Sequence, residues 1–169
     1  MLLMCYLFFF FRTYVNIVSV PSVENVIYLK SKPEICKFLH VGECSCWLGR
    51  AYKQSQDKRD KYHAIQEAMK SIDESVSHLK EFQGLKDFAV IYQPFTKNFT
   101  IERNGFEDFS LMSVDCFHMS QKGNSWAGAS LWNNILQPVG KKVKNWAAPT
   151  EEFLCPTETH PYIYTNDNS

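Results

Sequence analysis

The sequence of 169 residues predicts an α/β fold arranged around a parallel sheet, and two observations carry this prediction. First, two short segments rich in β-forming residues, 13–18 and 88–92, alternate along the chain with two longer segments of helical periodicity. Second, the apolar residues of these short segments are nearly continuous, as in strands that a parallel sheet buries on both faces. Because two strands are few for such a sheet, we expect this chain to supply only part of a larger parallel sheet.

After the first strand, residues 21–30 can form a short helix. Pro21 stands at an early position of this segment, and its apolar residues share one side: Val23, Val26 and Ile27. A connection that carries cysteines, residues 36–49, then leads to the next element.

The clearest helix spans residues 55–82. Its apolar residues recur at intervals of three and four: Tyr62, Ile65, Met69, Ile72, Val76 and Leu79. We expect this stripe to pack against the sheet. A coiled-coil seam is the alternative, although the stripe is shorter than four heptads.

The second half of the chain continues the alternation. Gly84 marks the end of the long helix, and Pro94 ends the second strand. Residues 96–113 are polar and rich in turn-forming residues. A last helix is predicted over residues 120–137, before the stop Pro-Val-Gly, and an irregular tail with three prolines follows residue 140.

Composition excludes several classes of protein. The 18 Lys and Arg residues balance 18 Asp and Glu residues, so the chain lacks the basic excess that nucleic-acid binding requires. A hydrophobic content of 45% is too high for a disordered chain. The Gly-rich nucleotide-binding patterns and Gly-x-Ser-x-Gly are absent from the sequence, and no Gly is followed by Asp.

Two features bear on secretion. Residues 1–11 form an apolar run that ends at Arg12 and is too short to span a bilayer. A secretory signal has an apolar core of this size, but it carries its positive charge before the core, so a signal peptide and a buried strand both remain open. Asn98 begins the N-glycosylation sequon Asn-Phe-Thr. We expect an extracellular or cell-surface location.

Five cysteines lie in the body of the chain: Cys36, Cys44, Cys46, Cys116 and Cys155. We interpret them as disulfide candidates, as in proteins of oxidising compartments. Their odd number leaves at least one without a partner in this set. The alternative is a zinc site in which His40 joins the first three cysteines, but the spacing matches no standard zinc motif.

A carboxylate and an imidazole three residues apart are the strongest candidates for catalysis. Asp115 can fold back onto the Nδ1–H of His118, fix its tautomer and leave Nε2 as a general base. Asp60 and His63 have the same spacing but fall on the polar side of the long helix, where we expect a solvated surface. Ser125 follows no strand and lies within the last helix, so a convincing nucleophile is missing.

The Asp-Cys-Phe-His core at residues 115–118 is followed by Gly123, by Leu-Trp-Asn-Asn at 131–134 and by Pro-Val-Gly-Lys at 138–141. With these motifs, residues 113–142 resemble the final catalytic block of the GDSL (SGNH) phospholipase B family. Further segments agree in order: 11–18 with a core strand, Cys44 and Cys46 with paired cysteines, 88–95 with a strand ending in Gln-Pro-Phe, and 155–164 with a segment that closes a repeat.

The resemblance implies the C-terminal part of an SGNH-hydrolase fold, a flavodoxin-like arrangement of three layers. It divides the chain into an apolar leader of uncertain status over residues 1–10, a partial hydrolase domain over 11–142 and an irregular tail over 143–169. In the intact enzyme, His118 would take the proton of a serine nucleophile and Asp115 would hold the imidazole, with no cofactor or metal. The implied substrates are phospholipid and lysophospholipid acyl esters, met at a membrane surface.

The sequence departs from this family at the nucleophile. Family members carry the Ser in a Gly-Asp-Ser block, followed by a Gly and an Asn that help to form the oxyanion hole, and none of these three blocks is present here. We therefore expect the chain to be inactive alone, and the unpaired cysteine to have its partner in the absent part. The alternative is a secreted, non-catalytic binding or structural fragment of the same ancestry.

Overall fold

The computed structural model describes residues 12–45, 55–149 and 151–169, and its architecture is α/β as predicted. Strand β1 (Thr13–Val18) pairs in parallel with strand β2 (Phe88–Gln93). The described residues contribute no third strand to this sheet. The leader expected over residues 1–10 lies outside the described residues, and so does Cys46.

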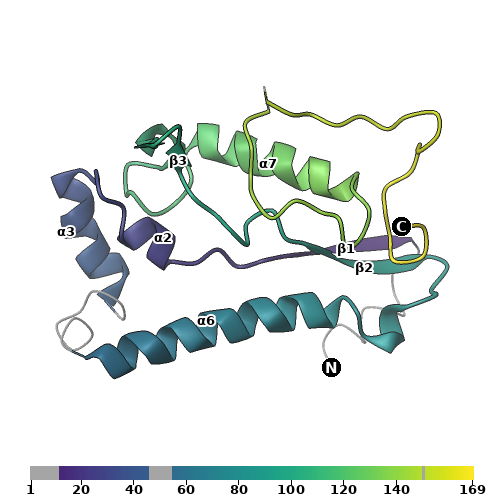
Figure 1. The fold of residues 1–169 in the computed structure, drawn as a ribbon, viewed down its shortest axis with the longest axis horizontal. Helices are drawn as coiled ribbons and strands as arrows, with labels where there is room; N and C mark the ends of the chain where they lie inside the picture. Colours follow the sequence, from purple (N-terminus) through teal and green to yellow (C-terminus); the bar gives the residue numbers. More distant parts are fainter. Residues whose placement is uncertain (1–11, 46–54, 150) are drawn as a thin grey trace.

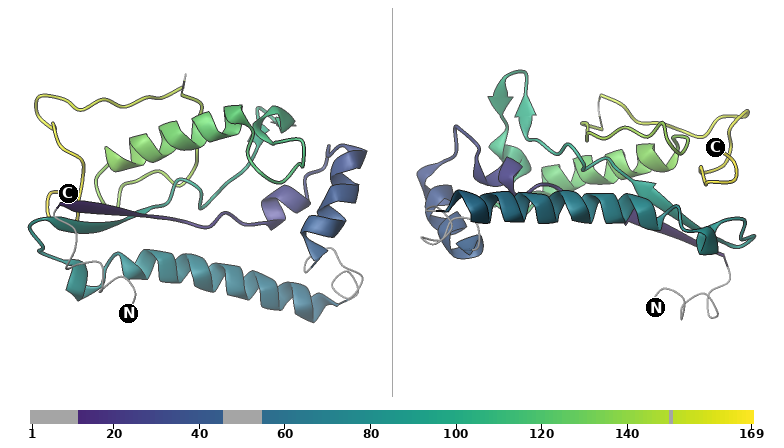
Figure 2. Two further views of the ribbon diagram at one scale, coloured as in Figure 1. Left: turned by 180° about the vertical axis from the view of Figure 1, so that it is seen from behind. Right: turned by 60° about the horizontal axis from the view of Figure 1, so that its bottom comes forward.

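Two long helices enclose the sheet in three layers. Helix α6 (Gln56–Val76) runs along one face of the strands and helix α7 (Gln121–Ile135) runs along the other (Figure 1, Figure 2). Both helices run opposite to the strands, so β1 and β2 point toward the end of the molecule at which α7 begins, although β2 itself ends beside the last turn of α7, where Asn134 binds the N–H of Phe95. Ligands of open α/β sheets bind outside the carboxyl ends of the strands, and a functional site is therefore expected at this end of the molecule.

Two shorter helices follow β1. Helix α2 (Glu24–Ile27) falls within the expected span. Helix α3 (Glu34–Glu43) occupies a segment that we expected only as a connection. Pro33 precedes its first residue. Cys36 and His40 lie one turn apart on the same side of the helix, and both are buried, with 1% and 0% of their surface exposed.

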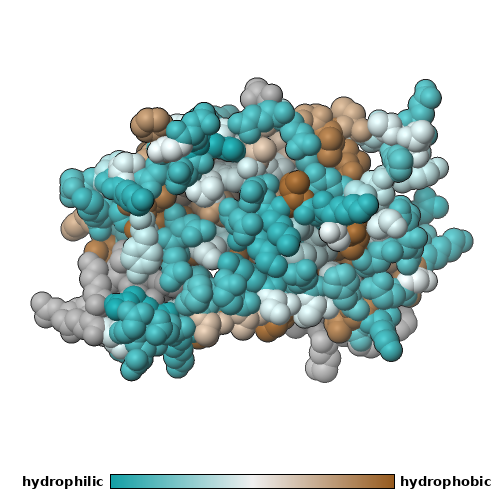
Figure 3. All heavy atoms as spheres, in the orientation of Figure 1, coloured by the Kyte–Doolittle hydropathy of each residue, from teal (hydrophilic) through white to brown (hydrophobic). Residues whose placement is uncertain are grey.

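Most of the apolar stripe of α6 does not pack against the sheet, so that expectation is wrong for every stripe residue except Tyr62 and Val76, which are partly buried. Ile65 and Ile72 remain 44% and 58% exposed, and apolar side chains appear along the lower edge of the molecule, where α6 runs (Figure 3). The helix is also shorter than predicted. Leu79 is extended, with ψ at 134°, and a separate 3-10 turn (Lys80–Phe82) completes the expected span.

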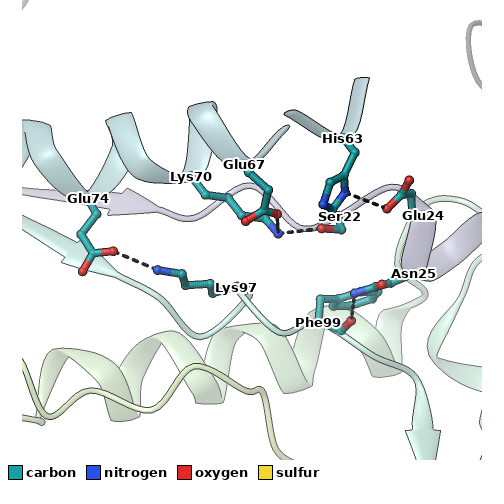
Figure 4. A network of polar contacts seen from close by, with 9 residues as sticks. All are labelled: Ser22, Glu24, Asn25, His63, Glu67, Lys70, Glu74, Lys97 and Phe99. Atoms are coloured by element: carbon teal, nitrogen blue, oxygen red, sulfur yellow. Dashed lines mark hydrogen bonds and ion pairs between the residues drawn. The ribbon is translucent and has the colours of Figure 1, made fainter. Parts of the chain in front are cut away.

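Polar side chains of α6 instead point toward the loops that follow the strands (Figure 4). Lys70 is 7% exposed, and its Nζ donates to the Ser22 hydroxyl at 2.7 Å and to Glu67 Oε1 at 2.8 Å. Lys97, in the loop after β2, donates to Glu74 at 2.9 Å. Buried charge is tolerated when it is paired in this way. Neighbouring residues of a helix are about 100° apart around its axis. Because Lys70 faces the protein, most of the neighbouring apolar stripe faces away from the sheet.

The main hydrophobic core lies between α7 and the loops after the strands. Its buried members are Val26, Phe95, Phe99, Ile101, Leu111, Met112 and Trp146. Trp146 comes from the C-terminal tail; its ring centroid lies 4.6 Å from that of Phe99, and its indole N–H donates to the Thr100 carbonyl at 2.6 Å. Leu111 and Met112 directly precede the segment that carries Asp115, so the core anchors the base of that segment.

Two neighbouring amides of α7 hold the C-terminal tail and the loop after β2. Among the described residues, none after α7 is in a helix or strand. Asn134 Oδ1 accepts the backbone N–H of Phe95 at 3.1 Å, and Asn133 Oδ1 accepts that of Leu154 at 2.8 Å. Side chains from one turn of α7 thus fix both the loop after β2 and the tail.

Candidate active site

Asp115 and His118 lie in a closed turn between the core and α7. An isolated antiparallel bridge between Met112 and Met119 closes this turn at its base. Within it, the backbone N–H of Ser113 donates to the carbonyl of His118 at 2.8 Å. Because the turn leads directly into α7, it lies at the end of the molecule toward which the two strands point (Figure 1).

The carboxylate of Asp115 accepts three hydrogen bonds from its own turn. Oδ1 accepts the backbone N–H groups of Phe117 and His118, both at 3.0 Å, and Oδ2 lies 2.7 Å from His118 Nδ1. The Phe117 N–H foremost, then the His118 imidazole and the His118 N–H, lower the pKa of Asp115 from 3.8 to about 2. Asp115 is therefore ionised at neutral pH.

The ionised carboxylate determines the tautomer of His118. A carboxylate can only accept, so His118 Nδ1 carries the hydrogen and donates it to Asp115. In the neutral imidazole, Nε2 is then an acceptor. No residue within the described ranges forms a hydrogen bond to Nε2, and the side chain is 74% exposed. The pair can serve as a general base toward a hydroxyl brought to it from outside.

A disulfide ties this turn to α3. Cys36 of α3 is bonded to Cys116, which lies between the two candidate catalytic residues and is 80 positions away in sequence. The disulfide prediction is confirmed for this pair. Cys44 is buried beside Ile27, and Cys155 is an exposed free cysteine of the tail.

The disulfide also removes Cys36 from the zinc alternative, because a bonded sulfur is not a thiolate ligand. His40 is engaged as well, since its Nε2 lies 2.8 Å from the carbonyl oxygen of Cys116. In the part of the chain that the structure describes, no group of three or more His, Cys, Asp or Glu residues is placed to hold a metal ion.

A polar hollow of about 630 Å³ opens near the carboxyl ends of the strands. Residues that follow β1 and β2 line it, among them Ser22, Asn25, Lys97, Asn98, Phe99 and Thr100. Neither Asp115 nor His118 is part of its lining, so the structure does not bring the hollow and the pair together.

The second Asp–His sequence of the same spacing forms no pair. Asp60 accepts a hydrogen bond from Gln56 Nε2 at 2.7 Å, whereas Nδ1 of His63 lies 3.3 Å from a carboxylate oxygen of Glu24. Ser125 is exposed on α7, as expected for a residue of the helix surface. Spacing alone therefore does not identify the candidate site.

Sequence reasoning named His40 only as a possible zinc ligand and Gly123 only as a motif residue, and it missed that both support the turn. His40 is fully buried against it. Gly123, in the first turn of α7, approaches the core so closely that an added Cβ would lie 2.2 Å from the carbonyl oxygen of Leu111. The available signal for His40 was its distance of four residues from Cys36, which places both on one side of a helix.

Comparison with known proteins gives three relatives, all described as membrane-associated phospholipase B1. The chain is 30% identical to the Homo sapiens protein over 162 residues, 30% identical to the Rattus norvegicus protein over 165 residues and 28% identical to the Mus musculus protein over 163 residues. Each alignment covers 94% of this chain, which spans 11% of the length of each relative. No family model and no solved structure matches the chain.

Proposed function

We propose, from the homology of this chain to a segment of phospholipase B, that it contributes the general base and the orienting acid to a serine-dependent phospholipase. The observation that carries the proposal is the 2.7 Å contact between His118 Nδ1 and Asp115 Oδ2, which leaves Nε2 as the acceptor. The position of the turn on the side of the molecule toward which the strands point supports it. The substrates are acyl esters of phospholipids and lysophospholipids.

In this mechanism, His118 Nε2 takes the proton of the serine hydroxyl as the oxygen attacks the ester carbonyl. The imidazolium then protonates the leaving alcohol, and Asp115 stabilises its charge throughout. No Gly-Asp-Ser block is present in the 169 residues, so this mechanism requires a nucleophile and oxyanion-hole donors that these residues do not supply. The chain alone is accordingly inactive.

An extracellular or cell-surface location, with substrate met at a membrane surface, belongs to the same proposal. Disulfides such as Cys36–Cys116 persist in oxidising compartments. Asn98 is exposed, as glycosylation of its sequon requires. None of the described helices is long and apolar enough to cross a bilayer.

A chimera tests the proposal directly. The chain replaces the matching segment of the human phospholipase B1 relative, and hydrolysis of a lysophospholipid is measured together with labelling by a fluorophosphonate probe. We expect the chimera to be active and the chain alone to remain unlabelled. His118→Ala is expected to lower kcat of the chimera by at least about 10³-fold, as for removal of a triad member.

His63→Ala is the matched control, because His63 has the same spacing from an Asp but no contact with it. Its chimera is expected to retain full activity. Activity that survives His118→Ala, or a folded chimera that hydrolyses nothing, would contradict the proposal. The second result would favour a non-catalytic role for the chain.

A further inference from the structure

The backbone at the centre of the Asp115–His118 turn is in an unusual conformation. Cys116 has a φ of 62°, in the left-handed region that residues other than glycine rarely adopt. Such a conformation persists only where the surroundings hold it.

Helix α3 contacts Cys116 through a disulfide and a hydrogen bond. Cys36 holds its side chain through the disulfide, and His40, one turn later on the same buried side of α3, lies 2.8 Å from its carbonyl oxygen through Nε2. Both α3 residues are buried, with 1% and 0% exposure. Side chain and main chain of Cys116 are thus fixed by one rigid element.

Lys32 determines which way the hydrogen bond of His40 runs. The Nζ atom of Lys32 donates to the Ile27 carbonyl at 2.5 Å and lies 3.2 Å from His40 Nδ1. An ammonium group has no acceptor, so Nδ1 must accept. The hydrogen of the neutral ring is therefore on Nε2, which donates it to the carbonyl of Cys116.

That carbonyl shares a peptide plane with the N–H of Phe117. In a trans peptide the C=O and the N–H point in opposite directions. When His40 holds the Cys116 oxygen on one side, the Phe117 N–H points to the other side, where Asp115 Oδ1 accepts it at 3.0 Å. The orientation of one peptide unit links buried His40 to the carboxylate that faces His118.

We infer that His40 is a positioning residue of this site: through the Cys116–Phe117 peptide it aims a backbone N–H at Asp115 and so fixes the carboxylate that orients His118. Its meaning for catalysis rests on the proposed hydrolase function, whereas the contact itself can be measured on this chain. His40 touches no reacting atom, and its action is exerted through the backbone.

Two measurements on the full chain test the inference, and neither needs turnover. Long-range ¹H–¹⁵N correlation spectra report the tautomer of His40, expected to carry its hydrogen on Nε2; a hydrogen on Nδ1 would overturn the inference. Carboxyl ¹³C shifts report the titration of Asp115. In His40→Leu we expect the pKa of Asp115 to rise by about one unit, because the Phe117 N–H is no longer held in place.

His40→Gln is the conservative variant, since its side-chain amide can donate to the same carbonyl, and it is expected to keep most of the low pKa. His160→Leu, at an exposed histidine of the tail, is the control and should change nothing. Mass spectrometry verifies that the disulfide is intact in each protein. An unchanged Asp115 titration in folded His40→Leu would refute the inference.

The hydrolase function and the positioning role of His40 are tested by different measurements, so each can be rejected without the other. An inactive chimera combined with the expected tautomer and titration would reject the hydrolase function and keep the positioning contact. If His40→Leu does not fold, the tautomer of the wild-type chain and the titration in His40→Gln still decide the outcome.

Discussion

Replacing Gly123 by Ala probes how tightly the candidate turn is set against the core. An added Cβ at this position would lie 2.2 Å from the Leu111 carbonyl oxygen and 3.2 Å from the Cβ of Met119. The oxygen is fixed, because Leu111 is fully buried and accepts the backbone N–H of Ser120 at 2.9 Å. Real Cβ atoms essentially never approach within 3.0 Å, so the first turn of α7 must move by at least about 0.8 Å.

The size of the effect follows from three contributions. Overpacking of this kind costs about 1–3 kcal/mol of unfolding free energy. Loss of the Ser120–Leu111 hydrogen bond costs about 1 kcal/mol more, and the better helix propensity of Ala returns about 1 kcal/mol. We expect Gly123→Ala to lower the free energy of unfolding by about 1–3 kcal/mol.

Gly128→Ala is the matched control, because it lies in the same helix and an added Cβ there meets no atom within 4 Å. It should raise the free energy of unfolding by about 0.5–1 kcal/mol through helix propensity alone. Urea unfolding, followed by the fluorescence of Trp126 and Trp146 in and beside the core, measures both variants. If Gly123→Ala is as stable as Gly128→Ala, the close approach of α7 to Leu111 is wrong.

Three further predictions concern covalent and charged contacts. Replacing Cys36 and Cys116 together by Ser removes a disulfide that joins residues 80 positions apart. From the entropy of the unfolded chain, this should lower the free energy of unfolding by about 4.5 kcal/mol. A loss below about 1 kcal/mol in urea unfolding would contradict the prediction. The pKa of Asp115 is lowered from 3.8 to about 2 in the folded chain. Its ionised carboxylate therefore contributes to the free energy of unfolding above pH 3.8, and this contribution is lost as the pH falls toward 2. Acid titration should show this loss in the wild type and not in Asp115→Asn. Burial lowers the pKa of Lys142 from 10.5 to about 8, so the unfolded chain binds more protons between these values and stability should rise from pH 8 to 10.5. Lys142→Met should lack that rise.

The strands and the two long helices were predictable because their signals are local. Residues 88–92 are β-branched, aromatic or small throughout, and α7 begins immediately after a Ser that caps it. The contact between Asp115 and His118 was also predictable, because both residues belong to one short turn; the two backbone hydrogen bonds to the carboxylate were not predicted. Sequence patterns predict best where the partners are neighbours in the chain.

Helix α3 and the orientation of α6 depend on distant residues and escaped prediction for that reason. The buried side of α3 consists mainly of Cys36 and His40, and their partner Cys116 lies 80 and 76 positions away. The inward side of α6 is chosen by Lys70, whose hydroxyl partner Ser22 is 48 positions away. Periodicity predicted an amphipathic helix correctly, but not which of its sides faces the protein.

Two Asp–His sequences of identical spacing behave differently in this chain, and the backbone explains why. In α6, the N–H groups two and three residues after Asp60 belong to the helical hydrogen-bond ladder and are not available to its carboxylate. In the turn, the corresponding N–H groups of Phe117 and His118 have no helical acceptor, so Asp115 Oδ1 accepts both. These bonds place Oδ2 of Asp115 next to Nδ1 of His118. Cys116, between Asp115 and His118, is in the left-handed conformation in this geometry. The same spacing gives a chemical pair in the turn, where α3 holds the residue between Asp115 and His118 through the disulfide and His40.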